Sequence, residues 1–179
     1  MSRLAPIVQK LDRAEKNLLL AAEAIPAHLW QTTPREGAWS AAEVVAHVIT
    51  VERAVVRAME RILQKQAKHV PLLKRFRLPF IFAERRLMRL KTPIPTDKQL
   101  LREKEGMLSE LRETRGRTLA LMEETSNRDL SAYRWRHPFL GSLSAYEWLV
   151  LLASHQIRHE KQMREIAARL PKAISDLQK

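Results

Sequence analysis

The sequence predicts an all-α protein, an antiparallel four-helix bundle with a basic, proline-punctuated insertion between its second and third helices. Two observations support this prediction. Apolar residues recur at three- and four-residue steps along four long segments, which is the pattern of amphipathic helices. The chain of 179 residues has 4 glycines, and its 9 prolines gather where such helices would begin or end. We expect one domain over residues 1–179, because this length supports a single sizeable core.

The first helix is predicted over about residues 3–27, followed by a loop at 28–38. The second is predicted over about 41–67, because Ser40 can cap it and Glu43 completes a capping box three residues later. In the second helix a histidine takes a place on the inner face that a valine would otherwise fill. The inner face of the first helix reads Leu4, Ile7, Leu11, Ala14, Leu18, Ala21 and Ile25, and that of the second Val44, His47, Val51, Val55, Ala58 and Ile62.

The insertion at residues 68–96 is irregular, with a short helix expected around 80–90. Residues 61–91 carry ten basic side chains and one acidic side chain, Glu84, so a local charge of +9 accounts for most of the net charge of +12. This basic segment could be a lid packed on the bundle, a collar that attracts an anionic substrate, or a contact with anionic membrane lipid. Nucleic acid is not favoured, because the aromatic residues lack a repeated stacking pattern.

The third helix is predicted over about 97–125, capped by Thr96 or Asp97, and residues 126–143 form a second connection. The fourth helix is predicted over about 144–169, capped by Ser142 or Ser144. Its inner face combines apolar residues with two histidines and a glutamine: Trp148, Leu152, His155, His159, Gln162 and Ile166.

Composition excludes several kinds of site. The chain has no cysteine, which rules out disulfides, thiolate zinc sites, iron–sulfur clusters and cysteine nucleophiles. No run approaches the roughly 18 consecutive apolar residues of a transmembrane segment, and no leader peptide is evident. We therefore expect a cytoplasmic protein.

Three histidines lie on predicted inner faces. His155 and His159 are four residues apart, which places them on one helix face with about 5–6 Å between their Cβ atoms, and His47 lies on another helix. Neutral imidazole is a common ligand of divalent metals, and burying three imidazoles without partners would be costly. The residues alone therefore leave two interpretations open: a metal site made of these three histidines, or core histidines that are hydrogen-bonded separately.

Other candidate residues are weaker. Gln162 and Glu43 each lie one turn from a histidine and could hydrogen-bond an imidazole N–H, although simple capping explains Glu43 better. Tyr146 and Arg158 are candidate substrate contacts. The remaining histidines, His28, His69 and His137, are expected to be solvated surface residues.

Residues 37–48 and 143–166 resemble the DinB-like (YfiT-like) family. The segment Gly-Ala-Trp-Ser-Ala-Ala-Glu-Val-Val-Ala-His-Val at 37–48 is similar to the family's Trp-Ser opening and second-helix histidine. Ser-Ala-Tyr-Glu-Trp-Leu, followed by His155, His159 and Gln162, resembles its last-helix motif H-x-x-x-H-x-x-Q. Lys-Thr-Pro-Ile-Pro at 91–95 resembles the proline-rich approach to the third helix.

The resemblance implies a four-helix bundle with one divalent metal, zinc or nickel, held by His47, His155 and His159. It also implies a small-molecule substrate. Better-understood relatives use a low-molecular-weight thiol such as bacillithiol or mycothiol, and many others are described only as metal-dependent hydrolases. We therefore expect a thiol S-transferase or a hydrolase. The alternative is a non-catalytic binding or stress-response protein whose metal is structural or absent. A homodimer through an exposed bundle face is compatible with the sequence.

Overall fold

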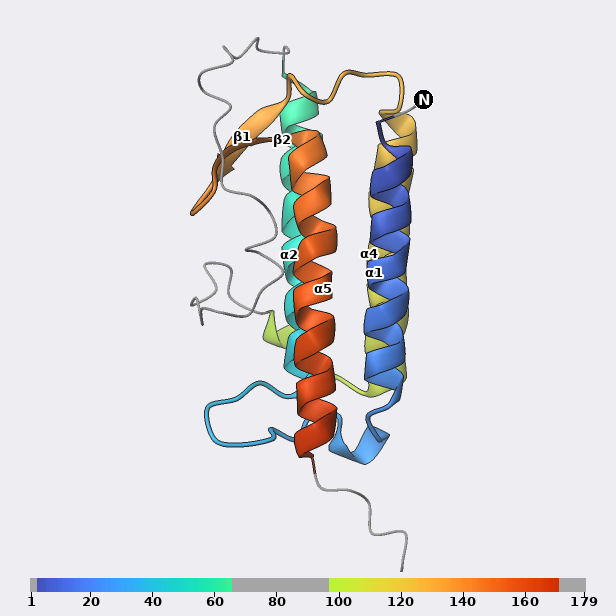
Figure 1. Cartoon of the computed structure of the whole chain (residues 1–179), viewed down its shortest axis with the longest axis vertical. Helices are drawn as coiled ribbons and strands as arrows, with labels where there is room; N and C mark the ends of the chain where they lie inside the picture. The colour runs from blue at the N-terminus through green and yellow to red at the C-terminus, as the bar shows by residue number, and fades with distance from the viewer. Residues whose placement is uncertain (1–2, 66–96, 171–179) are drawn as a thin grey trace, which may run out of the picture.

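The computed structural model describes residues 3–65 and 97–170 (Figure 1). Two short 3₁₀ helices, η1 (Ala27–Leu29) and η3 (Lys98–Leu100), precede the second and third long helices. The helix expected around 80–90 and the rest of the insertion 68–96 lie outside the described residues. The predicted four-helix bundle is confirmed, and its helices are α1 (Ala5–Glu23), α2 (Ala41–Leu63), α4 (Lys104–Glu124) and α5 (Ala145–Arg169).

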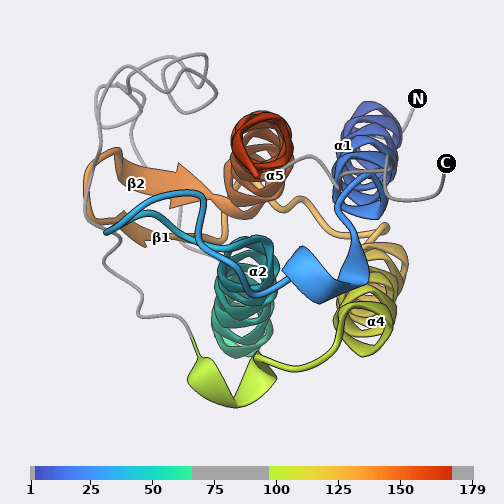
Figure 2. The ribbon, with the colours of Figure 1, turned by 90° about the horizontal axis from the view of Figure 1, so that it is seen from below.

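The four long helices occupy the corners of a square when the bundle is viewed along its axis (Figure 2). α1 packs against α5 and α4, and α2 packs against α4 and α5. The colours of Figure 1 show that α1 and α5 run in one direction while α2 and α4 run in the other. The antiparallel order expected of the bundle therefore holds for α2 with α5 and for α1 with α4, whereas α1 with α5 and α2 with α4 are parallel.

Capping boxes begin the two helices that carry the candidate histidines. At α2 the Ser40 backbone N–H donates to Glu43 Oε2 at 2.8 Å, and the Glu43 N–H donates to Ser40 Oγ at 3.2 Å. Ser144 and Glu147 form the equivalent box at α5. Reciprocal capping satisfies backbone donors that the first turn leaves free, and so fixes where each helix begins. The expected cap at Ser40 is confirmed, and Ser144 rather than Ser142 caps α5.

α4 begins later than expected. It starts at Lys104, and the Glu103 carboxylate caps it by accepting the Gly106 backbone N–H at 2.7 Å. Asp97, expected to cap this helix, instead accepts the Gln99 N–H at 2.9 Å and so stabilises the short η3. Two polar residues with capping ability therefore divide the predicted helix 97–125 into a 3₁₀ turn and the long α4.

The connection at 126–143 contains a hairpin that the sequence analysis did not predict. Strand β1 (Arg134–His137) pairs antiparallel with β2 (Gly141–Ser144), with His137 opposite Gly141. Gly141 has a φ of +79°, a conformation that favours glycine. The strands are four residues long and lack β-branched residues, so the pattern that identifies strands is missing. The hairpin lies beside α2 and α5 (Figure 2).

The core has two apolar clusters with buried polar residues between them. One cluster includes Leu18, Ala21 and Ala22 of α1 with Val44, Val45 and Ile49 of α2, and the other includes Ile7, Leu11 and Ala14 of α1 with Leu149, Leu152 and Ala153 of α5. The side chains between them, here called the polar layer, are Glu52, Thr114, Arg115, Thr118 and Gln156, all buried. None of the helices within 3–65 and 97–170 combines the length and apolar character that a membrane span needs.

Candidate metal centre

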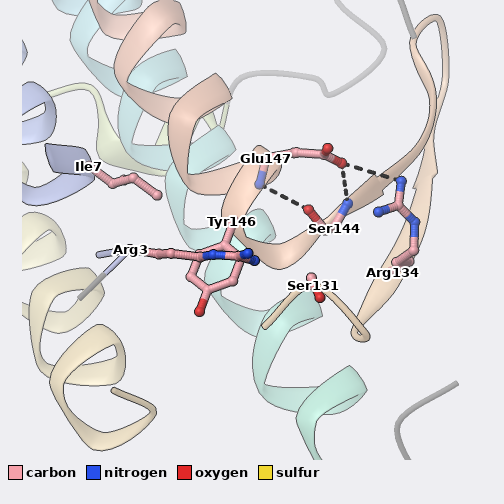
Figure 3. A pocket seen from close by; sticks show the side chains of 7 residues that line it. All are labelled: Arg3, Ile7, Ser131, Arg134, Ser144, Tyr146 and Glu147. Atoms are coloured by element: carbon pink, nitrogen blue, oxygen red, sulfur yellow. Dashed lines mark hydrogen bonds and ion pairs between the residues drawn. The ribbon is translucent and has the colours of Figure 1, made fainter. Parts of the chain in front are cut away.

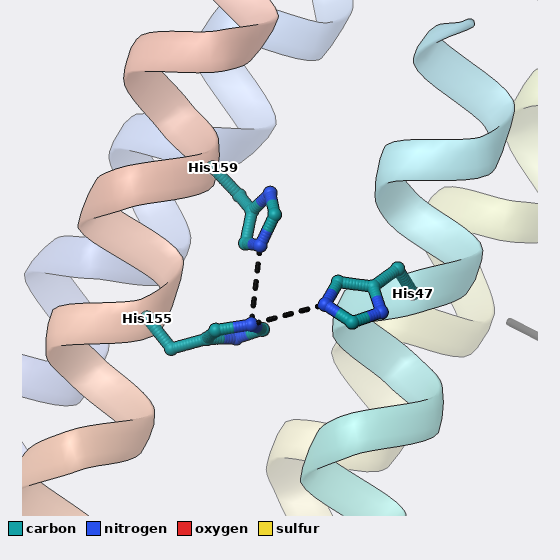
Figure 4. A group of neighbouring side chains, drawn as sticks. All are labelled: His47, His155 and His159. Atoms are coloured by element: carbon teal, nitrogen blue, oxygen red, sulfur yellow. Dashed lines mark hydrogen bonds between the residues drawn. The ribbon is translucent and has the colours of Figure 1, made fainter. Parts of the chain in front are cut away.

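The side chains of His47, His155 and His159 meet between α2 and α5 (Figure 4). His155 Nε2 lies 3.2 Å from His47 Nε2 and 3.1 Å from His159 Nε2. A set of ligand atoms, one from each of the three residues, lies within 4.8 Å of one another. Residues 108 positions apart in the chain therefore direct ring nitrogens toward one point.

This spacing fits a bound metal ion. Imidazole nitrogens bind zinc at about 2.0–2.1 Å, and in a tetrahedral site two such nitrogens lie about 3.4 Å apart. The two short Nε2···Nε2 distances, 3.1 and 3.2 Å, are close to that value. Two of the three nitrogen pairs therefore have nearly the separation that a tetrahedral site requires, and three protein ligands would leave the fourth position open for another ligand.

Hydrogen bonds among the three rings cannot use all of the Nε2 atoms that face one another. His159 Nδ1–H donates to Gln162 Oε1 at 3.0 Å, so in the neutral ring His159 Nε2 carries a lone pair. That lone pair faces His155 Nε2, which also faces His47 Nε2. One proton on His155 cannot make a well-aligned hydrogen bond to both neighbours. A cation at the meeting point would use all three lone pairs.

Burial keeps the three imidazoles in the form that binds metal. It lowers the pKa of His47 to about 4, and burial together with the charges of His47, Arg158 and His137 lowers the pKa of His155 to about 3. Burial also holds the pKa of His159 well below its ordinary value, against the opposing hydrogen bond to Gln162. All three rings are neutral at pH 7, and His155 is the most exposed of the three residues, since His47 and His159 are buried.

Gln162 and Glu43 differ in their relation to the cluster. Gln162 contacts His159 directly through the hydrogen bond to Nδ1, and so fixes which nitrogen of that ring faces the other histidines. Glu43 makes the capping box with Ser40, and no hydrogen bond joins it to an imidazole within the described parts of the chain.

Trp39 is part of the cluster, although sequence analysis gave it no role there. Its ring meets His47 edge-on at a centroid distance of 5.0 Å and stacks on His159 at 6.3 Å with an interplanar angle of 6°. The residue precedes the Ser40 cap, so the start of α2 holds it over two of the three imidazoles. The Trp-Ser pair noted at this position was the available signal.

The other histidines are separate from the cluster. His28 is exposed on η1, and His69 lies outside the described residues. His137, expected to be a solvated loop residue, is instead half-buried at the end of β1, where its ring contacts Trp148 at 5.1 Å. The hairpin places it there, and since the hairpin was not predicted, the position of His137 was not either.

The two candidate substrate contacts fall in different places. Arg158 lies on α5 between His155 and His159, and its charge lowers the pKa of both. Tyr146 lies in the first turn of α5, about three turns away, in a pocket of about 420 Å³ that Arg3 and Arg134 also line (Figure 3). None of the three candidate histidines lines this pocket. Its charges are largely balanced, because Arg3 pairs with Asp129 and Arg134 pairs with Glu147.

Two solved structures share the fold. TT2238, described as a four-helix bundle protein, is 23% identical, with a TM-score of 0.57 over 89% of this chain and 97% of that one. YfiT from Bacillus subtilis, described as a probable metal-dependent hydrolase with an unusual four-helix bundle topology, is 18% identical, with a TM-score of 0.64 over 92% of this chain and 85% of that one. No curated protein matches the sequence. Residues 10–163, most of the chain, match the DinB superfamily, and the protein therefore belongs to that superfamily.

Proposed function

We propose that the protein binds one divalent transition-metal ion through His47, His155 and His159 and uses it as an enzyme acting on a small molecule. The observation that supports this proposal is the convergence of three neutral imidazoles on one point between α2 and α5. The likeness to YfiT, described as a probable metal-dependent hydrolase, points the same way. Imidazole suits zinc and nickel, and these are the metals we propose.

Three protein ligands and an open position are typical of catalytic rather than structural metal sites. When bound, such an ion supplies Lewis acidity that favours the deprotonated form of a water or a thiol. The chain's own residues prepare the site. Gln162 sets the His159 tautomer, Trp39 shields His47 and His159 from water, and His155 is the most exposed of the three residues.

Two reactions fit this arrangement: hydrolysis, and transfer from a low-molecular-weight thiol such as bacillithiol or mycothiol. Because the chain has no cysteine, a thiol would have to come from outside the protein. Metal-loaded protein is assayed with thiols plus electrophiles and, separately, with panels of esters and amides. Turnover that requires both metal and thiol identifies a transferase, and thiol-independent turnover identifies a hydrolase. No turnover in either panel favours the non-catalytic alternative.

Metal content tests the ligand assignment directly. We expect protein purified without a polyhistidine tag and reloaded with zinc to hold about one equivalent, as three converging imidazoles require. His155→Ala and His159→Ala each remove a ligand, and we expect metal retention after dialysis to fall below about a tenth of an equivalent. Elemental analysis measures the content.

His28→Ala and His137→Ala are the matched controls, because neither residue belongs to the cluster. Both should retain metal as the unaltered protein does. Equal metal content across all four variants would refute the assignment, and absence of metal from the unaltered protein would refute the proposed function itself.

A further inference from the structure

His137 is held in one protonation and tautomeric state by the hairpin tip. Its Nδ1 accepts the backbone N–H groups of Phe139 at 3.1 Å and Leu140 at 3.2 Å. A nitrogen that accepts two hydrogen bonds has no proton, so in the neutral ring the proton is on Nε2. Burial lowers the pKa of His137, which keeps the ring neutral at pH 7. His137 therefore presents a fixed Nε2–H donor.

The hairpin brings this ring to the same face of α5 as the metal-site histidines. Trp135 and His137 are two residues apart on β1 and so face the same side, and both contact Trp148, at 4.9 and 5.1 Å between ring centroids. Trp148 precedes His155 by two helical turns on one face of α5, about 10 Å along the axis. The influence of His137 on the pKa of His155 agrees with this proximity.

The Nε2–H group of His137 has no hydrogen-bond acceptor in the described part of the protein. Within residues 3–65 and 97–170, no group accepts a hydrogen bond from it, whereas Nδ1 has two partners. His137 is half-buried, and its Nε2 is not a fully buried atom without a partner. Water or a ligand can therefore reach Nε2. A fixed, accessible donor on an otherwise aromatic surface is a feature of ligand-binding sites.

We propose that His137 is a substrate-binding residue whose Nε2–H donates a hydrogen bond to a carbonyl or carboxylate oxygen of the small molecule at the metal's open position. The inference rests on the proposed function, because it needs a ligand at the metal. It names a substrate class: a molecule with one metal-binding end and an acceptor oxygen farther along. The stacked rings of Trp135 and Trp148 supply an apolar surface beside that oxygen.

Two substitutions separate the two nitrogens of His137. In His137→Asn the side-chain oxygen replaces Nδ1 and can still accept from the hairpin, but nothing replaces Nε2–H. In His137→Gln the terminal amide can replace the Nε2–H donor, whereas the Nδ1 acceptor is lost. Cobalt-loaded protein is titrated with 3-mercaptopropionate and with propanethiol, and visible absorption reports thiolate binding. The two probes share the metal-binding sulfur and differ in the acceptor oxygen.

We expect the unaltered protein and His137→Gln to bind 3-mercaptopropionate more tightly than propanethiol. In His137→Asn that preference should fall about three- to tenfold, the effect of one hydrogen bond, with propanethiol binding unchanged. Cobalt content should be equal in all three proteins. An undiminished preference in His137→Asn, or equal losses in both variants, overturns the role of His137. If the unaltered protein binds no cobalt, the proposed function fails first, and metal content measured before the titration identifies that outcome.

Discussion

The surroundings of Glu15 disfavour the charged form of its side chain. Burial raises its pKa from 4.5 to about 7; Glu52 and Asp12 raise it further, while Arg115 and Arg112 oppose the shift. Its Oε1 is buried and has no hydrogen-bond partner among the described residues. The folded protein therefore binds this proton more tightly than the unfolded chain does. The resulting stabilisation is full below about pH 4.5 and is lost as the pH rises through about 7.

Glu15→Gln removes this titration and keeps the shape of the side chain. We expect the variant to match the unaltered protein at pH 4.5 and to be more stable by about 1–2 kcal/mol at pH 8, a figure reduced for the partial exposure of Glu15. Urea denaturation of both proteins from pH 4.5 to 8 measures the difference. A difference that does not grow with pH would contradict the proposed protonation of Glu15.

At the same scale, the sequence predicted which histidines meet but not what surrounds them. His47, His155 and His159 could be identified because each interrupts an apolar helical face. The regular periodicity of a helix allows the residues that share one face to be predicted from the sequence. Trp39 and His137 lie in a loop and a short hairpin. Their positions depend on how those segments fold back on α2 and α5, and a loop or short hairpin has no regular sequence pattern from which this path can be predicted.

At the scale of elements, the polar layer joins three helices through one arginine. Arg115 of α4 donates to Glu52 of α2 at 3.0 Å and to Gln156 of α5, and Thr118 donates to the other Glu52 oxygen at 2.6 Å. Burial raises the pKa of Glu52, while Arg115 and the Thr118 hydrogen bond lower it. The layer satisfies the carboxylate from two sides, so removing the arginine alone leaves a buried, unpaired acid.

We expect Arg115→Met to destabilise the protein by about 3–5 kcal/mol, and Arg115→Met combined with Glu52→Leu to recover most of that loss, because the unpaired charge is gone. Urea denaturation of both proteins measures these changes. Arg117→Met is the matched control: Arg117 pairs with Glu113 on the same helix but is 64% exposed, and its loss should cost under about 1 kcal/mol. Similar destabilisation by Arg115→Met and Arg117→Met would show that the buried ion pair contributes no more to stability than the exposed one.

Elements with a strong local signal were predicted well, and those without one were not. α2 and α5 begin at capping boxes that can be read from Ser40 and Ser144 with a glutamate three residues later. α1 ends at Glu23 rather than at residue 27, since Pro26 disfavours helical conformation in the residue before it. The parallel arrangement of α1 and α5 follows from connections whose paths local patterns do not specify.

At the scale of the whole molecule, the proposed metal would link α2 to α5, two helices that are neighbours in space and distant in the chain. An ion that binds only the folded protein stabilises it by about 2.7 kcal/mol at a free concentration one hundred times Kd. For a chain of this size, that stabilisation corresponds to a rise of about 5–11 °C in Tm.

We expect zinc to raise Tm by this amount and a chelator to reverse it, as measured by thermal denaturation. His47→Ala removes the only ligand on α2 and should abolish the shift, whereas His28→Ala should keep it. A zinc-induced shift that survives His47→Ala would mean that the ion stabilises the bundle from somewhere other than the contact between α2 and α5.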